Sequence, residues 1–389
     1  MIPRTDSKIR VPQRGFSLAA AILVAGVCAG MPVQADDSTA PTVIPTVSAL
    51  NMLENPRSKG LGGSGVALGR DIGLVQLNPA AANGSSPGSI SFTGQRGIFG
   101  EQTGQVLASN QIPLGTIILG AGYYNAGETE MTLEDFTTKT VNTQRDFIGE
   151  LGFATSPGWN VAVGATVKYM KSEMAEEFKA DAIAVDIGAQ VNLTRTLKAG
   201  MAVRNIGKGY RYLDESNAAP TSITMGLAAI IQMAESVGIS ITDADVAILT
   251  ADAESMANAE FLSAQAGLEY RTFRVFSFRV GIRQSPYEAM RSISAGLGFM
   301  VTAPLGGRET RFRLDYAVEF GNQTFTQPHI LGLTIEITEK IMESSSKEEA
   351  PPPAPVDMAP AYEAPPALPS IPDETPVPPE TGEENIPNP

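Results

Sequence analysis

One stretch has the residue spacing of a chemical motif. Residues 60–65 read Gly-Leu-Gly-Gly-Ser-Gly and fit the dinucleotide-binding pattern G-x-G-x-x-G. That pattern binds a pyrophosphate only where it joins a strand to a helix in a βαβ unit. Here it lies in a glycine-dense segment, 58–84, and no alternation of helix and strand patterns follows. The sequence therefore predicts no cofactor. We expect the glycines to let main chains approach closely.

Nucleophilic and metal chemistry have few candidate residues. The sequence holds one histidine, His329, and one cysteine, Cys28, which lies near the N-terminus. A Ser-His arrangement needs its histidine to face a substrate, whereas the alternation from His329 to Ile335 puts His329 on the apolar face of its segment. Carboxylates do not cluster at metal-ligand spacings. We therefore expect no catalytic residue, no metal site and no enzyme activity.

The elements that position these residues alternate with a period of two. After residue 88, apolar residues alternate with small or polar ones in pieces of about ten residues, the length that crosses a bilayer as a tilted strand. No apolar run long enough for a transmembrane helix, roughly 18 residues, follows the N-terminal region. The sequence thus predicts an all-β fold, a transmembrane antiparallel β-barrel of about fourteen strands. The expected strands are 89–96, 103–112, 115–126, 144–155, 159–170, 181–192, 198–206, 221–232, 236–248, 261–271, 274–284, 291–301, 310–320 and 328–337.

The connections between these strands alternate between long and short, as in outer-membrane barrels, which have short periplasmic turns and longer outer loops. The strand 236–248 has the weakest pattern because Asp243 and Asp245 interrupt it. Without it the strand number would be odd and the two ends of the barrel domain would lie on opposite sides of the membrane. We therefore expect a strand there, a short turn at 233–235 and a long outer loop at 249–260.

Charged residues within the strands fall on the face opposite the apolar one. On the lipid face near the bilayer centre an Arg or Lys costs about 2 to 4 kcal/mol, so we expect these residues to face the lumen. There they can pair across strands and with Arg70 or Asp71. Two roles stay open, a structural lattice of ion pairs or a part in selectivity and gating. The expected lumen-facing charges are Lys168, Asp186, Arg204, Glu269, Arg271, Arg279, Arg283, Arg311, Arg313, Asp315, Glu319 and Glu336.

Composition divides the chain into four parts. Residues 1–35 combine basic residues, an apolar run and a small-residue cleavage site, typical of a secretory signal peptide. A periplasmic lead and plug (36–88) and the barrel (89–337) follow, and 338–389 is expected to be an acidic, Pro-rich, disordered periplasmic tail. This tail is either a spacer or a contact for a periplasmic or cell-wall partner. Much of the formal net charge of −14 lies there. No basic surface remains for binding nucleic acid.

Four short stretches resemble a known family. Residues 62–68 (Gly-Gly-Ser-Gly-Val-Ala-Leu), 77–81 (Leu-Asn-Pro-Ala-Ala), 202–207 (Ala-Val-Arg-Asn-Ile-Gly) and 328–333 (Pro-His-Ile-Leu-Gly-Leu) are similar to patterns of the PorV/PorQ-type proteins of the FadL outer-membrane channel superfamily. The resemblance spans 49–337. It implies a fourteen-strand barrel with an N-terminal plug. The expected plug residues are Gly62, Gly63, Gly65, Arg70, Asp71, Asn78 and Pro79.

The sequence departs from this family at two places. Ile337 stands where the last strand of a barrel usually carries an aromatic residue, and Arg70-Asp71 stands where the family has an Asp-Asp pair. The first departure affects the expected signal for barrel assembly. The second affects the contacts that the plug would inherit from the family.

The resemblance implies two different functions. The superfamily implies a channel in the bacterial outer membrane that moves hydrophobic or amphipathic compounds and is gated by its plug. The PorV branch instead implies a component of type IX secretion that receives or shuttles exported cargo proteins. The expected partners are outer-membrane lipid, hydrophobic small molecules and, for the second function, secreted cargo.

Overall fold

The structure is a computed structural model. Contacts divide the chain into two units, Met1–Ile341 and Met342–Pro389. The expected signal peptide (1–35) lies outside the described residues, as does the expected tail (338–389) beyond residue 340. No helix in the described part of the chain is long and apolar enough to cross a membrane. The described residues are 49–97, 100–132, 136–158, 160–212, 215–217, 219–233, 245–257, 262–285, 290–321 and 328–340.

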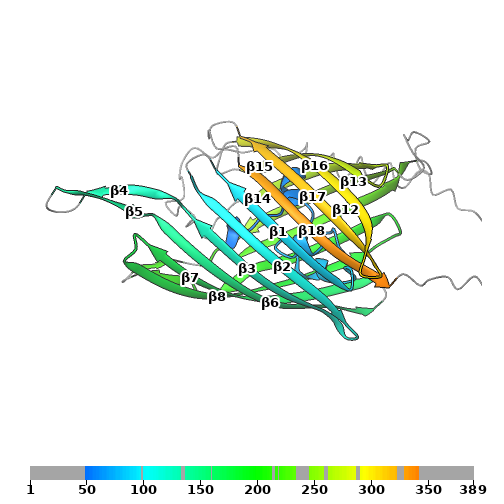
Figure 1. The fold of residues 1–389 in the computed structure, drawn as a ribbon, viewed down its shortest axis with the longest axis horizontal. Coiled ribbons are helices and arrows are strands. Elements are labelled where there is room, and N and C mark those ends of the chain that lie inside the picture. The colour runs from blue at the N-terminus through cyan, green and yellow to red at the C-terminus, as the bar shows by residue number, and fades with distance from the viewer. Residues whose placement is uncertain are drawn as a thin grey trace, which may run out of the picture. The chain divides into compact units, whose positions relative to one another are not determined.

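Fourteen strands form one closed antiparallel barrel, which confirms the predicted fold class (Figure 1). The first strand, β1, pairs with the last, β18, and closes the sheet; Ser91 lies opposite Thr334, with their hydroxyl oxygens 3.1 Å apart. The strands of the barrel are β1 (Gly88–Arg96), β2 (Gln102–Ile112), β3 (Gly115–Asn125), β6 (Gln144–Gly158), β7 (Val161–Met174), β8 (Phe178–Asn192), β9 (Leu197–Gly207), β12 (Ser222–Gln232), β13 (Val246–Met256), β14 (Leu262–Thr272), β15 (Phe276–Ser285), β16 (Met290–Leu305), β17 (Arg308–Phe320) and β18 (His329–Lys340).

The expected strand 236–248 is wrong in position. The ninth barrel strand is β13, which begins ten residues later, and most of the expected outer loop 249–260 is strand. β12 ends at Gln232 and β13 begins at Val246. Most of the turn expected at 233–235, and residues 236–244 of the expected strand, lie outside the described residues. The error arises because β13 carries Asp252 and Glu254 on its inward face, where both are buried. Two acids within a short segment resemble a loop until their buried partners are known.

Two small hairpins lie outside the barrel sheet. β4 (Glu128–Thr132) pairs with β5 (Thr138–Asn142), and β10 (Tyr210–Tyr212) pairs with β11 (Glu215–Asn217). Figure 1 shows the β4–β5 hairpin projecting past the barrel wall. Both hairpins lie in connections at the same end of the barrel, which we call the hairpin end. The other end, where β1 begins and β18 finishes, is the terminal end.

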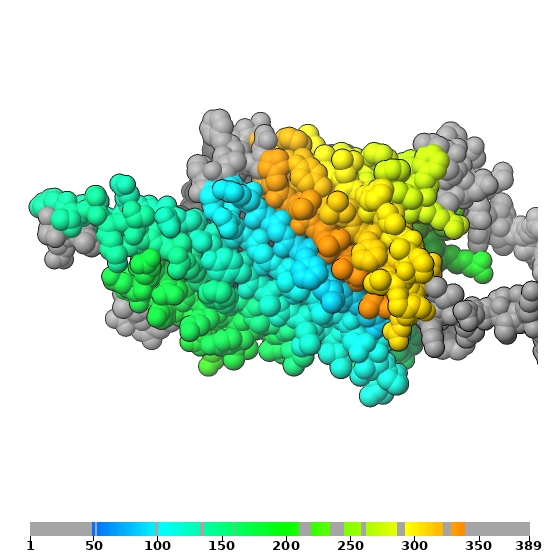
Figure 2. Space-filling view, viewed as in Figure 1, coloured from blue at the N-terminus to red at the C-terminus, as the bar shows by residue number. Residues whose placement is uncertain are grey.

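The two faces of the wall differ in polarity. Along β7, Gly164, Thr166 and Lys168 are buried, whereas Val167 and Tyr169 on the other face are each 49% exposed. Figure 2 shows β1, β2 and β18 packed side by side on one face of the molecule. An apolar outer face with an inner face of small, polar and charged residues is the pattern of barrels that stand in lipid.

Residues 49–87 run through the interior of the barrel, and we call them the inner segment. It contains α2 (Ala49–Met52), α3 (Pro56–Gly60) and two 3-10 helices, η1 (Ile72–Leu74) and η2 (Pro79–Ala82). α2 contacts β3 and β6, α3 contacts β15 to β18, η1 contacts β1 and β2, and η2 contacts β6, β7 and β8. Because these strands surround the barrel axis, the inner segment crosses the lumen from one side of the wall to the other.

Candidate functional site

Short polar caps and glycine turns shape the inner segment. Asn55, Asp71 and Asn78 cap α3, η1 and η2, because each side-chain oxygen accepts a hydrogen bond from a backbone N–H two residues later. Between α3 and η1 the chain reverses at Gly62 and Gly63, whose φ angles are +74° and +85°. A side chain at either position would be strained. The glycine motif at 60–65 thus follows a helix and forms a turn, while β1 begins only at residue 88.

A closed ring of six charged side chains, five of them buried and Arg313 13% exposed, joins the inner segment to the wall, and we call it the charge ring. Arg57 and Asp71 come from the inner segment, and the other four members come from β14, β15 and β17. Cations and carboxylates alternate around the ring, so each member contacts two partners of opposite charge, with N to O distances between 2.7 and 3.0 Å. In order, the members are Arg57, Glu269, Arg279, Asp315, Arg313 and Asp71.

The ring holds its inner-segment members in their charged forms. Burial alone would raise the pKa of the Asp71 carboxyl, but the guanidiniums of Arg313 and Arg57 outweigh it and hold that pKa well below its usual range. Arg57 likewise has a raised pKa, because Glu269 and Asp71 outweigh the effect of its burial. A complete ring compensates its buried charges, whereas loss of one member would leave a buried charge without a partner.

A second set of ion pairs surrounds the ring. Lys59 of α3 contacts Glu54 at 2.8 Å and also pairs with Glu319 of β17. These two carboxylates raise the pKa of Lys59 against the opposing effect of its burial. All twelve charges that the alternation put on the inward face make ion pairs. The pairs outside the ring are Lys168–Asp186, Arg204–Glu254, Arg283–Glu254, Arg271–Glu269, Arg311–Glu336 and Lys59–Glu319.

Outside the ring, on β13 and on β8, side chains fix the inner segment by hydrogen bonds to its main-chain atoms. Asp252 of β13 accepts from the backbone N–H groups of Gly65 and Val66, at 2.6 and 2.8 Å. The Gln190 amide donates to the carbonyl oxygens of Val66 and Leu68, at 2.9 and 2.7 Å. The Asn78 amide donates to Val66 at 2.8 Å and to a carbonyl of β8 at 3.1 Å. The segment is thus bound on both sides.

Glycines of the wall make room for the inner segment. A side chain at Gly267 would approach the Leu61 Cβ at 2.6 Å, and one at Gly200 would lie 2.7 Å from the Ala67 Cα. Such separations are shorter than atoms tolerate, so these inward positions accept no larger residue while the segment is in place. Gly164, Gly188, Gly281 and Gly332 face the segment in the same way, and Gly122 and Gly296 leave slightly more room, at 3.0 and 3.2 Å from its nearest atoms.

The expected plug residues divide into two groups. Gly62, Gly63 and Gly65 form turns, and Asp71 and Asn78 make the contacts described above, with Pro79 beginning η2. Arg70 differs from them. Its backbone has a φ of +62°, its side chain is exposed, and within the described residues it makes no ion pair. The pairing expected for Arg70 or Asp71 therefore falls to Asp71 alone.

Four residues in or near the site are missing from the sequence prediction. Arg57 stands one residue before the glycine-dense stretch 58–84, and Thr250, Asp252 and Glu254 were hidden by the misplaced strand. Alternation along the correct β13 would have found the last three. His329 lies on the outer face as expected, where its Nδ1 is 2.6 Å from the Tyr316 hydroxyl. In the described part of the chain, no group of three His, Cys, Asp or Glu residues is placed to hold a metal.

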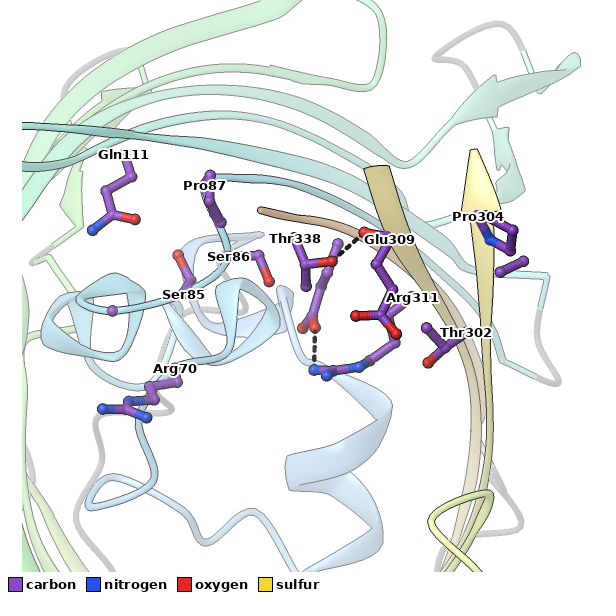
Figure 3. Close-up of a pocket in the computed structure, with 13 residues that line it drawn as sticks. Arg70, Ser85, Ser86, Pro87, Gln111, Thr302, Pro304, Glu309, Arg311 and Thr338 are labelled. Atoms are coloured by element: carbon purple, nitrogen blue, oxygen red, sulfur yellow. Dashed lines mark hydrogen bonds and ion pairs between the residues drawn. The ribbon is translucent and has the colours of Figure 1, made fainter. Parts of the chain in front are cut away.

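Two cavities lie at the terminal end of the lumen. The larger, about 880 Å³, is lined by Arg70, residues 84–87, and side chains of β16, β17 and β18. Figure 3 shows Arg70 from the inner segment and Arg311 from β17 beside this cavity, with Arg311 paired to Glu336. The second, about 450 Å³, lies between the inner segment and strands β9 to β18. Arg70, Arg311 and Glu336 line both cavities.

These features define a class of protein, a closed β-barrel whose own N-terminal segment fills the lumen. No model of a known protein family and no curated protein matches the sequence. Among solved structures, the chain is similar to the toluene transporter TbuX of Ralstonia pickettii, with 13% identity and a TM-score of 0.44 over 74% of this chain and 98% of that one. It is also similar to the toluene transporter TodX of Pseudomonas putida (12%, 0.43, 72% and 96%) and to a FadL homologue of Pseudomonas aeruginosa (10%, 0.44, 72% and 97%).

Proposed function

We propose that this protein is an outer-membrane channel of the PorV/PorQ type for hydrophobic or amphipathic compounds, gated by its inner segment. The observation that carries the proposal is an apolar surface inside the barrel at the hairpin end. Ile148, Met170 and alanines of β8 face the lumen there, and Leu50 and Leu53 of the inner segment cover them. A water-filled porin has a polar interior. An apolar interior surface suits a compound that avoids water.

Displacement of α2 would open this surface. α2 is a helix of four residues that packs mainly by apolar contact, with the Ala49 N–H also bonded to Asp146. By contrast, Arg57 of α3 and Asp71, which caps η1, are buried members of the charge ring. Apolar contacts can be exchanged for contacts with an apolar compound, since both remove a similar surface from water. We therefore propose that the compound enters at α2, where apolar packing holds the inner segment. It passes through the barrel only if the rest of the segment shifts within the lumen.

A reversible covalent lock tests the gating. The side-chain oxygens of Ser64 and Thr250 are 2.5 Å apart and join the inner segment to β13, so Ser64→Cys with Thr250→Cys should form a disulfide. The matched control is Ser91→Cys with Thr334→Cys, which joins β1 to β18 within the wall. The assay is passage of a neutral hydrophobic naphthylamine dye into proteoliposomes. We expect the oxidised Ser64–Thr250 lock to stop passage, reduction to restore it and the wall lock to have no effect. Equal passage through both oxidised proteins would contradict gating by the inner segment.

A second variant tests the apolar surface itself. Met170 is 1% exposed and lies in the cluster covered by α2. Met170→Gln keeps the length of the side chain and adds an amide, so we expect slower passage of the dye in a barrel that still folds. Val167→Gln in the same strand, on the outer face, should leave passage unchanged. Equal slowing by the two variants would show that the apolar lumen surface has no specific role in passage of the dye.

The β4–β5 hairpin supports a second candidate function, capture of exported cargo proteins at the hairpin end in type IX secretion. Its two strands pair only with each other among the described residues, and Glu128 to Glu130 and Thr138 to Thr140 are exposed. Gly127 accepts a backbone hydrogen bond from Thr143, so 128–142 can be deleted and the ends rejoined. For a channel, the deletion should leave dye passage intact. Loss of surface-anchored proteins from cells with an intact channel would favour the secretion role.

A further inference from the structure

The smaller cavity at the terminal end has an unusual charge. Eight cationic side chains and one carboxylate, Glu336, line it, and the volume is about 450 Å³. The cations come from the inner segment, from four strands of the barrel wall (β9, β14, β15 and β17) and from the turn after β14. They are Arg57, Arg70, Lys198, Arg271, Arg274, Arg279, Arg311 and Arg313.

The carboxylates in the described part of the chain do not balance these cations. Five of the eight make ion pairs, and the carboxylates they contact are four, Asp71, Glu269, Asp315 and Glu336. Among the described residues, four positive charges are therefore left without a counter-charge. Asp245, at the same end of the barrel, accepts hydrogen bonds from Tyr270 and Thr272 and does not line the cavity.

Three of the cations, Arg70, Lys198 and Arg274, make no ion pair with any described residue. They converge on the cavity from separate elements, the inner segment, the start of β9 and the turn between β14 and β15. Like charges held close together repel one another. Arg70 and Arg274 also have φ angles of +62° and +58°, which cost energy for residues other than glycine.

We propose that this cavity binds a multivalent oxyanion of the phosphate class. Guanidinium groups bind phosphate oxygens through paired, charge-assisted hydrogen bonds. Four uncompensated positive charges favour an anion that carries more than one negative charge over a single carboxylate. Ser277 and Gln232 also line the cavity and can donate to further oxygens. The proposal is independent of which compound crosses the barrel, because it concerns a site at the end opposite the apolar surface.

The phosphate could come from two sources, a free anion such as pyrophosphate or the phosphate monoester of a lipid headgroup. Both present the same oxygens to the cations, and the adjoining cavity of about 880 Å³ shares Arg70, Arg311 and Glu336 with the site (Figure 3). A free anion would bind in neutral detergent without any lipid. A headgroup would bind only when its acyl chain is present.

The test is isothermal titration of the purified full chain, folded in neutral detergent, with pyrophosphate, with lysophosphatidic acid and with laurate. We expect a phosphate ligand to bind and the double variant Arg70→Asn with Lys198→Gln to weaken it at least about tenfold, since each lost charge-assisted hydrogen bond is worth about one decade. Asn is chosen at position 70 because it tolerates a positive φ. The control is Arg195→Gln, which removes an exposed cation at the same end that does not line the cavity.

Each outcome decides the proposal. Pyrophosphate binding that the double variant weakens supports a free-anion site, and binding of lysophosphatidic acid alone with the same sensitivity supports a headgroup site. No binding of either phosphate ligand would overturn the proposal, as would binding that the double variant does not change. Laurate binding as tight as phosphate binding would overturn the assignment to multivalent anions. Heat-modifiable mobility on a gel checks that each variant is a folded barrel. If the double variant does not fold, the two single variants, Arg70→Asn and Lys198→Gln, are titrated in its place.

Discussion

The inner segment is held differently on its two sides. Toward β14 to β17 its partners are charged, and Arg57 and Asp71 complete the charge ring with 2.8 to 2.9 Å contacts to Glu269 and Arg313. Toward β7, β8 and β9 the partners are mostly neutral, the exception being Arg204 of β9, which donates to the Gln76 carbonyl. There the Asn78 and Gln190 amides bind main-chain carbonyls, and Gly164, Gly188 and Gly200 let the segment approach the wall.

Two kinds of interaction therefore hold the inner segment in the lumen, buried ion pairs on one side and close packing with amide hydrogen bonds on the other. A buried ring of charges is compensated only when it is complete, so it specifies a single position for the segment. Packing against glycines and amide hydrogen bonds is lost in smaller steps, each worth about 1 kcal/mol or a little more. We therefore expect damage to the charged side to be cooperative and damage to the neutral side to be local.

The largest effect is expected from Glu269→Gln. Glu269 is fully buried and contacts Arg57, Arg271 and Arg279. Its neutralisation leaves three guanidiniums facing one another, and loss of one partner from a buried ion pair typically costs about 3 to 5 kcal/mol. Urea unfolding, followed by heat-modifiable mobility, measures the loss. The control is Glu309→Gln, an exposed carboxylate of β17. A cost for Glu269→Gln as small as that of the control would contradict a compensated ring.

A smaller effect is expected on the neutral side from Gly200→Val. The new side chain would collide with the main chain at Val66 and Ala67, and overpacking of this kind costs about 1 to 3 kcal/mol. Gly149→Val provides the matched control, because Gly149 lies in a strand with no atom near its missing side chain. Protease cleavage within the inner segment should increase only for Gly200→Val. If the two variants are cleaved alike, the close approach of segment and wall does not hold.

Acid should loosen the charged side before the neutral one. The pKa of Asp71 is lower in the folded protein than in the unfolded chain, so its stabilising effect is complete above the ordinary aspartate pKa of about 3.9 and is lost as the pH falls through the acid range. Pepsin cleavage of the inner segment, measured against falling pH, follows this loss. At the least acidic pH at which pepsin is active, Asp71→Asn should be cleaved faster than wild type. Its cleavage rate should then rise less than that of wild type as the pH falls. Identical pH profiles for the two proteins would disprove the contribution of Asp71.

The smallest effect is expected from Arg311→Gln. Arg311 pairs with Glu336 at 3.0 Å, but its side chain is 41% exposed at the terminal end. Exposed pairs contribute less than about 1 kcal/mol. Unfolding in urea should therefore differ little from wild type. A loss comparable to that of Glu269→Gln would mean that the charged lattice extends to the mouth of the lumen.

The alternation of residues was enough to predict the barrel and the side on which its charges gather. Lipid leaves an ionised side chain in a strand only the inward face, so Glu269 and Arg313 could be assigned to one face without a structure. Their partners could not be assigned. Which cation meets Glu269 depends on where α3 lies in the lumen, and nothing near Arg57 in the sequence marks it as that partner.

The error at β13 has a similar cause. Asp252 is buried because two backbone N–H groups of the inner segment bind it, at 2.6 and 2.8 Å. A sequence pattern weighs an aspartate as if water surrounded it, and so favours a loop at this place. Glycines were easier to interpret in part. Their density in 58–84 predicted close packing. The role of the wall glycines that contact the segment, such as Gly200 and Gly267, could not be predicted, because it depends on where both the wall strands and the inner segment lie.

The central claim is that the inner segment occupies and closes the lumen. Conductance in planar bilayers tests it most directly, with the full chain compared with a variant that lacks residues 58–84, each shown to be a folded barrel by heat-modifiable mobility. We predict that the full chain is nearly silent and that the deletion opens a large, steady conductance, since it removes Asp71 and most of the contacts that cross the lumen. A folded deletion variant with the same conductance as the full chain would contradict the account.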